Sequence, residues 1–133
     1  MLTHGNELAI AQVQAIKWQF DQETVNLTSG PLYHVGSFEC LLMPALICHG
    51  TAVTLASGAF TLHRLLDVAR TQRASMVLIY TFMLYELARM DDLEDVFPAQ
   101  LHRVLCGGDT LMPWVYEELA RRLPELEDRK SVV

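Results

Sequence analysis

Cysteine and lysine are both scarce in this sequence of 133 residues. The three cysteines form no Cys-x-x-Cys pair, and no Cys/His set has the spacing of a zinc site. This excludes a disulfide framework and a zinc finger, and free thiols in a reducing cytosol are the expectation. Lys17 and Lys130 are the only lysines, and neither lies in a glycine-rich segment that could hold a phosphate.

Positive charge is also low, and continuous apolar sequence is limited to one stretch. The net charge of −6 excludes the basic surface of a nucleic-acid-binding domain. Residues 41–62 carry no charge, but Pro44, His49 and Gly50 interrupt them, so we predict a turn and a strand there and no membrane span. Residues 1–20 lack the basic start and apolar core of a secretory signal, and a cytoplasmic location is expected.

The rest of the sequence alternates between strand and helix patterns. We predict short strands at residues 25–28, 52–55 and 101–105 and, from an unbroken apolar run, a buried strand at residues 76–80. Helical patterns lie between and beside these strands, including a single helix over about residues 36–48, whereas residues 91–98 are acidic and have the composition of a loop. We expect Asn6 and Thr61 to cap two of the helices. In the first helix, at residues 7–20, we expect a buried stripe that comprises Leu8, Ile10, Ala11, Ala15 and Trp18. The alternation predicts an α/β domain over residues 1–126, with a layered, mainly parallel sheet and helices on both faces. Residues 127–133 are interpreted as a disordered tail.

Two loops follow predicted strands and are therefore candidate ligand-binding segments, because ligands of open parallel sheets bind beyond the carboxyl ends of the strands. The first contains Tyr33, His34, Val35 and Gly36, where an imidazole beside an aromatic ring offers a flat, partly polar wall. The second is Gly107-Gly108-Asp109-Thr110, where paired glycines let the backbone approach a flat ligand. Capping of the helix that starts near Pro113 is the alternative role for Asp109 and Thr110.

Three segments taken in order, residues 1–6, 29–36 and 106–111, resemble the acyl-CoA synthetases of the adenylate-forming superfamily. They read Met-Leu-Thr-His-Gly-Asn, Ser-Gly-Pro-Leu-Tyr-His-Val-Gly and Cys-Gly-Gly-Asp-Thr-Leu. The resemblance implies that His34, supported by Tyr33, lines the acyl pocket and gates the entry of pantetheine. It implies that the loop at residues 107–110 packs against adenine, although the family usually has Gly-Gly-Ala-Pro-Leu there.

The resemblance also carries an expectation for Tyr80 and Thr81, which follow the strand at residues 76–80. The family often has a Pro-Thr-Met turn at this place that shapes the acyl pocket, and this sequence has no proline there. The two side chains border that pocket or belong to the core, and the residues alone do not decide between these roles.

Several parts of such an enzyme are expected outside these residues. The resemblance implies ATP, Mg²⁺ and CoA as cofactors of the parent family and a carboxylic acid or acyl-adenylate as ligand. It places the phosphate loop before Met1, and a Tyr-Gly-x-Thr-Glu motif and a catalytic lysine after Leu126. Adenylation needs magnesium and cationic clamps on the phosphates. We therefore expect no catalytic residue, no metal site, no tightly bound cofactor and no adenylation by this chain alone.

Three functional interpretations remain open at this point. The chain is part of an acyl-CoA synthetase, a non-catalytic acyl-binding or interaction module, or an unrelated doubly wound protein that binds a nucleotide or effector. Unpaired sheet edges favour association with other strands, so self-association is expected in each case.

Overall fold

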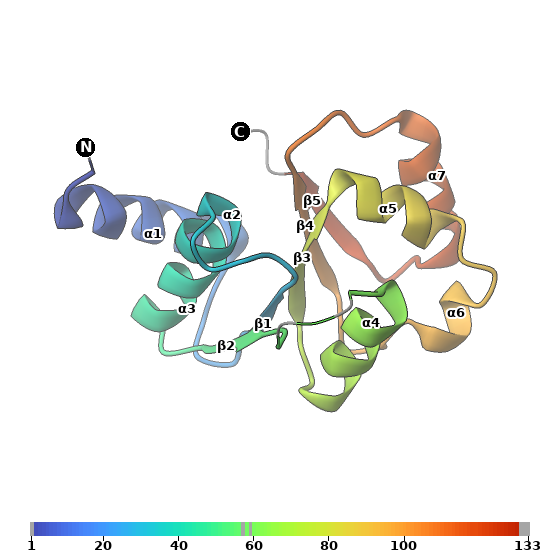
Figure 1. Cartoon of the computed structure of the whole chain (residues 1–133), viewed down its shortest axis with the longest axis horizontal. Helices are drawn as coiled ribbons and strands as arrows, with labels where there is room; N and C mark the ends of the chain where they lie inside the picture. Colours follow the sequence, from blue (N-terminus) through green and yellow to red (C-terminus); the bar gives the residue numbers. More distant parts are fainter. Residues whose placement is uncertain (1, 57, 59, 131–133) are drawn as a thin grey trace.

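A five-stranded parallel sheet organises the computed structural model, which describes residues 2–56, 58 and 60–130. The strand order is β2-β1-β3-β4-β5 (Figure 1). The strands are β1 (Val25–Thr28), β2 (Thr51–Thr54), β3 (Met76–Tyr80), β4 (Arg103–Gly107) and β5 (Glu127–Lys130). The helices are α1 (His4–Trp18), α2 (Val35–Ser37), the π-helical turn η1 (Phe38–Leu42), α3 (Met43–Ile47), α4 (Leu62–Thr71), α5 (Thr81–Ala88), α6 (Leu93–Val96) and α7 (Pro113–Arg122). The predicted α/β class and parallel sheet are confirmed.

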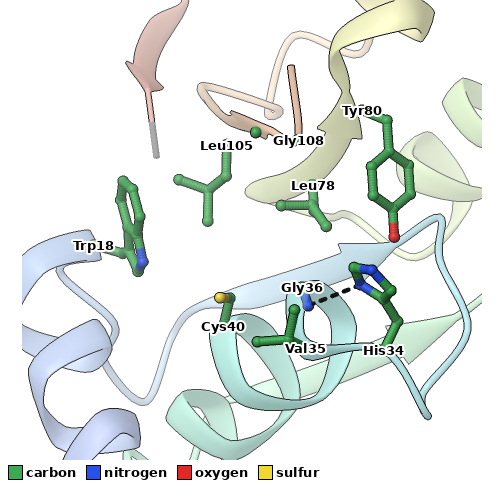
Figure 2. Close-up of a pocket in the computed structure, with 10 residues that line it drawn as sticks. Trp18, His34, Val35, Gly36, Cys40, Leu78, Tyr80, Leu105 and Gly108 are labelled. Atoms are coloured by element: carbon green, nitrogen blue, oxygen red, sulfur yellow. Dashed lines mark hydrogen bonds between the residues drawn. The ribbon is translucent and has the colours of Figure 1, made fainter. Parts of the chain in front are cut away.

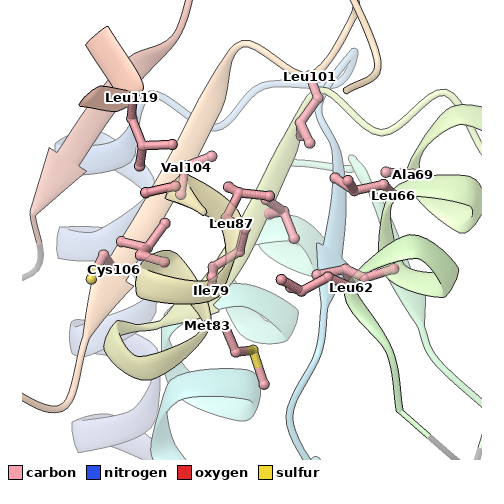
Figure 3. Packing of buried hydrophobic residues seen from close by; sticks show 14 of the residues in the cluster. Leu62, Leu66, Ala69, Ile79, Met83, Leu87, Leu101, Val104, Cys106 and Leu119 are labelled. Atoms are coloured by element: carbon pink, nitrogen blue, oxygen red, sulfur yellow. The ribbon is translucent and has the colours of Figure 1, made fainter. Parts of the chain in front are cut away.

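Helices cover both faces of the sheet, as predicted, because alternate residues of the central strands point to opposite sides. Val77 and Ile79 of β3 belong to the larger core cluster, beneath α4, α5 and α7 (Figure 3). Met76 and Leu78 belong to a second cluster on the other face, with Trp18 of α1 and residues of η1 and α3. Figure 1 shows α1 to α3 on one side of the sheet and α4 to α7 on the other. The central strands are thus buried on both faces.

Helix α1 begins earlier than predicted and buries less of its apolar surface. Thr3, and not Asn6, is the N-cap residue, and Asn6 completes a capping box from the third helical position. The expected stripe is correct for Ala11, Ala15 and Trp18. It is wrong for Leu8 and Ile10, which are 47% and 38% exposed. The helix has apolar residues on two sides, so periodicity alone could not identify the side that packs.

The helical stretch over residues 35–47 lies where a single helix was predicted, but it contains the π-helical turn η1. A π turn departs from the regular pattern of backbone hydrogen bonds in a helix. The buried Asn26 of β1 supports this turn, since its side-chain amide donates to the Leu41 carbonyl at 3.2 Å. The irregular turn is therefore built into the packing of the helix on the sheet.

Strand β5 lies where a disordered tail was expected. Its backbone pairs with β4 in parallel, with Arg103 opposite Glu127 and Cys106 opposite Lys130. The pairing depends on the backbone, and the charged sequence Glu-Asp-Arg-Lys carries no strand pattern, so the sequence could not predict it. Residues 131–133 of the expected tail lie outside the described residues. Within the described part of the chain, no helix has the length and apolarity needed to cross a membrane.

Candidate functional site

One cavity lies on the sheet face covered by α1 to α3, near the carboxyl ends of the central strands. Its volume is about 160 Å³. The lining comes from four separate parts of the chain: the end of α1, the loop after β1 with the start of the following helices, strand β3, and strand β4 with its exit. The lining residues are Trp18, His34, Val35, Gly36, Cys40, Leu78, Tyr80, Leu105, Gly107 and Gly108 (Figure 2).

His34 stands at the cavity as the N-cap of α2. Its Nδ1 accepts a hydrogen bond from the backbone N–H of Gly36 at 3.2 Å (Figure 2). Because Nδ1 is the acceptor, the neutral ring carries its proton on Nε2, which is then the donor. The ring also meets Tyr80 edge to face, with 6.2 Å between the centroids. His34 therefore combines a fixed ring position with one N–H group that the cap leaves available.

Tyr80 ends β3 and packs tightly against the loop that carries His34. A Cβ atom built on Gly30 would lie 2.3 Å from the Tyr80 hydroxyl and 2.6 Å from Ser37 Oγ, so a larger residue would force these side chains to shift. The same loop is tied to β1, since the Thr28 hydroxyl donates to Ser37 Oγ at 2.7 Å. These contacts hold the phenol ring beside the imidazole.

Thr81 anchors the exit of β4 and does not line the cavity. It is buried, and its hydroxyl lies 3.2 Å from both the Gly107 and the Asp109 carbonyls. Gly108 between them has φ +98°, a conformation that side chains rarely adopt. The hydroxyl thus fixes the shape of the loop that faces the cavity.

Asp109 and Thr110 are exposed, and the hydrogen bond between them is local to the loop. The Asp109 carboxylate accepts a hydrogen bond from the backbone N–H of Thr110 at 2.6 Å. Neither residue caps α7, whose N-cap is Met112. Tyr33 is 94% exposed and lies outside the cavity lining. Of the predicted site residues, the structure brings together His34, Val35, Gly36, Tyr80, Gly107 and Gly108 at the cavity, and leaves Tyr33, Thr81, Asp109 and Thr110 outside its lining.

Cys40 lies on the π-helical turn and lines the cavity. Burial, followed by the nearby Glu39 carboxylate, raises the pKa of the Cys40 thiol above its ordinary value. The thiol is therefore protonated at neutral pH and acts as a small, weakly polar group. The Gln14 side-chain amide donates a hydrogen bond to the sulfur, with 3.9 Å between nitrogen and sulfur.

Trp18 was expected in the core but was not expected at the site. It is 2% exposed and lies at the opposite end of the cavity from Tyr80 (Figure 2). The Arg103 guanidinium donates to the Trp18 carbonyl at 2.7 Å and to the Gln19 carbonyl at 2.8 Å, so β4 fixes the end of α1. No pattern in the sequence links residues 18 and 103. In the part of the chain that the structure describes, no cluster of side chains has the composition of a metal site.

Comparison with known proteins gives one family and many structures of the same fold. The model of the family described as AMP-binding enzyme matches residues 1–132. A search of curated proteins gives no match. A luciferase-like enzyme from the mealworm Zophobas morio is 15% identical, with a TM-score of 0.83, over 99% of this chain and 30% of that one.

Two CoA ligases align in the same way. A long-chain-fatty-acid–CoA ligase from Archaeoglobus fulgidus is 18% identical, with a TM-score of 0.82, over 98% of this chain and 27% of that one. An o-succinylbenzoate CoA synthetase from Bacillus subtilis, in complex with AMP, is 21% identical, with a TM-score of 0.76, over 90% of this chain and 24% of that one. The TM-scores show a shared fold, and at these identities the likeness shows the fold alone. The chain spans between 24% and 30% of the length of these three structures.

Proposed function

The chain belongs to the AMP-binding enzyme family, and we propose that it forms part of the acyl and adenine pocket of an ATP-dependent carboxylate–CoA ligase. One observation carries the proposal. The loop after β1 and the loop after β4 are more than 70 residues apart in the sequence, yet His34 and Gly107 line one cavity. Tyr80, from the strand between them, closes the same end.

The residues at this end suit a flat ligand with a carboxyl group. His34 offers an N–H on Nε2, and the His34 and Tyr80 rings form an edge-to-face wall. Gly107 and Gly108 offer backbone without side chains, which suits the approach of a planar base. In the proposed ligase, ATP activates the carboxylate as an acyl-adenylate and CoA receives the acyl group. The chain's own part is to position the acid and to shield it from water.

The proposal assigns binding of the acid to this chain and binding of the phosphates to other parts of such an enzyme. Transfer of the adenylyl group of ATP to a carboxylate, with release of pyrophosphate, requires cationic clamps on the phosphates. Lys17, one of the two lysines, has its ammonium group 4.9 Å from the centre of the Trp18 ring. We therefore propose that this chain alone binds acids but does not adenylate them.

Two measurements test this function together. In ATP–pyrophosphate exchange with Mg²⁺ and a panel of aliphatic and aromatic acids, we expect no exchange by the purified chain, and exchange above that of a mock purification would contradict this part. Direct binding of the same acids tests the pocket. His34→Asn keeps an acceptor for the helix cap and removes the ring, so it should weaken binding. Tyr33→Ala, one residue away but outside the cavity, is the matched control and should leave binding unchanged.

We propose further that a second copy of the chain covers its exposed apolar surface in solution. The edge strands of the sheet are β2 and β5. On α1, Val13 and Ile16 are 60% and 81% exposed, on the side opposite the buried residues. Light scattering at increasing concentration should show oligomers that Ile16→Lys reduces. A monodisperse monomer at high concentration would contradict the proposal.

A further inference from the structure

We propose that Trp18 determines which class of acid the cavity accepts, by donating its indole N–H to an acceptor at the far end of the acyl group. The inference rests on the proposed function, since it takes the cavity to be the acid pocket. It adds a substrate class, namely small aromatic or short-chain acids with a neutral hydrogen-bond acceptor distal to the carboxylate.

The indole nitrogen of Trp18 is a buried donor without a partner. Among the described residues, none offers an acceptor within hydrogen-bond distance of Nε1, and the atom is inaccessible to solvent. An indole nitrogen can only donate, and buried tryptophans usually find a partner. A buried donor that remains unsatisfied is unfavourable by about 1–3 kcal/mol. Because Nε1 exposes almost no surface to a water-sized probe, the indole has to rotate slightly toward the cavity when a ligand binds, and a ligand that then supplies an acceptor removes that penalty.

The backbone at Trp18 is fixed, which limits how far the indole can turn away. Arg103 holds the Trp18 and Gln19 carbonyls, and Gln19 ends α1 in the left-handed conformation with φ +56°. The Lys17 ammonium group lies over the ring. In Figure 2, the indole nitrogen lies on the edge of the ring nearer Cys40, which is also part of the cavity lining.

The shape of the cavity defines what reaches this donor. Tyr80 and His34 stand at one end and Trp18 at the other, with the apolar Leu78, Leu105 and Val35 between them (Figure 2). A cavity of about 160 Å³ is close to one that holds a benzene molecule. A ligand with its carboxylate at the Tyr80 end would therefore present its distal atom to Trp18.

Charge further narrows the class of acid. The described lining residues include no lysine or arginine. A second carboxylate at the inner end would be buried without a counterion, which is strongly unfavourable. The distal group is thus a neutral acceptor, such as a ring nitrogen, a carbonyl or an ether oxygen.

Nuclear magnetic resonance on the isotope-labelled chain tests this directly. The sequence contains only two tryptophans, Trp18 and Trp114, so the indole region of a ¹⁵N–¹H spectrum should contain two signals. Trp114→Phe assigns them, because Trp114 packs on Tyr85 and Arg89 away from the cavity. The probes are isonicotinate and benzoate, which have the same shape but differ by a ring nitrogen opposite the carboxylate.

We expect isonicotinate to move the Trp18 Nε1–H proton to lower field and benzoate to leave it nearly unchanged. Trp18→Phe should weaken isonicotinate binding about tenfold, the equivalent of one hydrogen bond, and change benzoate binding by less than about twofold. If Trp18→Phe does not fold, the comparison of isonicotinate with benzoate on the wild-type chain still tests the role of Trp18.

The outcomes separate this inference from the proposed function, since neither readout requires ATP or adenylation. If both acids bind at the cavity but move the indole signal equally, or if Trp18→Phe weakens both equally, the role of Trp18 is refuted and the acid pocket stands. If neither acid perturbs Trp18, His34 or Tyr80 at millimolar concentration, the acid pocket itself is refuted.

Discussion

Replacement of Thr81 by valine tests whether a single hydroxyl shapes the loop after β4. The hydroxyl lies 3.2 Å from both the Gly107 and the Asp109 carbonyls, but it has one proton to donate. The two carbonyls therefore share one hydrogen bond. A neutral hydrogen bond contributes about 1 kcal/mol, so the two contacts are not counted twice.

The surroundings of the two carbonyls decide how large the loss becomes. A buried acceptor without a partner would add a desolvation penalty of about 1–3 kcal/mol. Gly107 is only half-buried and Asp109 is exposed, so water can reach their carbonyls in the variant. We therefore expect Thr81→Val to lower the free energy of unfolding by about 1 kcal/mol, which corresponds to roughly 3–5 °C in Tm for a chain of this size.

The assay combines urea unfolding with amide hydrogen exchange at residues 107–110. Thr81→Ser is the matched control, because it keeps the hydroxyl and removes the methyl group. Loss of a buried methyl group also reduces stability by about 1 kcal/mol, so stability alone does not separate the variants. We expect faster exchange in the loop for valine only. Equal exchange in the two variants would refute the anchoring role of the hydroxyl.

Three further predictions concern an ion pair, a thiol and a close contact. Arg122 lowers the pKa of Glu94 from 4.5 to about 2, so the pair stabilises the fold above pH 4.5 and this contribution is lost as the pH falls through about 2. The effect of Glu94→Gln on the urea midpoint should therefore shrink over this range, and a constant effect would contradict the ion pair. Because the pKa of Cys40 is raised, iodoacetamide should modify Cys40 more slowly at neutral pH than it modifies a free cysteine, and Glu39→Gln should accelerate the modification. Mass spectrometry measures the rates, and equal rates for Cys40 and free cysteine would refute the shift in pKa. Gly30→Ala places a Cβ 2.3 Å from the Tyr80 hydroxyl and should destabilise the chain by about 1–3 kcal/mol. Thermal melts should show partial recovery with Tyr80→Phe, and no recovery would mean that the phenol is not the obstacle.

Strand β3 could be predicted because its residues are apolar without interruption. The run at residues 76–80 predicts β3 with the bounds that the structure has. Strand β4 lies two residues later than predicted, at Arg103–Gly107. The predicted strand starts at Leu101, but pairing with β3 begins only at Arg103, opposite Met76. Hydrophobicity thus locates a strand, and the neighbouring strand decides its ends.

Edge and surface elements were harder to predict, because backbone pairing or a few local bonds form them. Residues 91–98 were not expected to contain α6, a single turn with only Leu93 buried. Strand β5 pairs with β4 in a segment of four charged residues. No periodic pattern of apolar residues is needed for either element, and none is present.

The two ends of the cavity also differ in how far the sequence could predict them. His34 and Gly107 follow strands, and parallel topology brings the ends of strands together, so this end could be expected from the order of the elements. The position of Trp18 depends on how α1 crosses the sheet, which Arg103 determines from 85 residues away. Such a contact between distant residues leaves no local pattern. The sequence therefore indicates the family through the loops at the strand ends, whereas the group that we propose selects the acid lies at the inner end and becomes visible only in the folded chain.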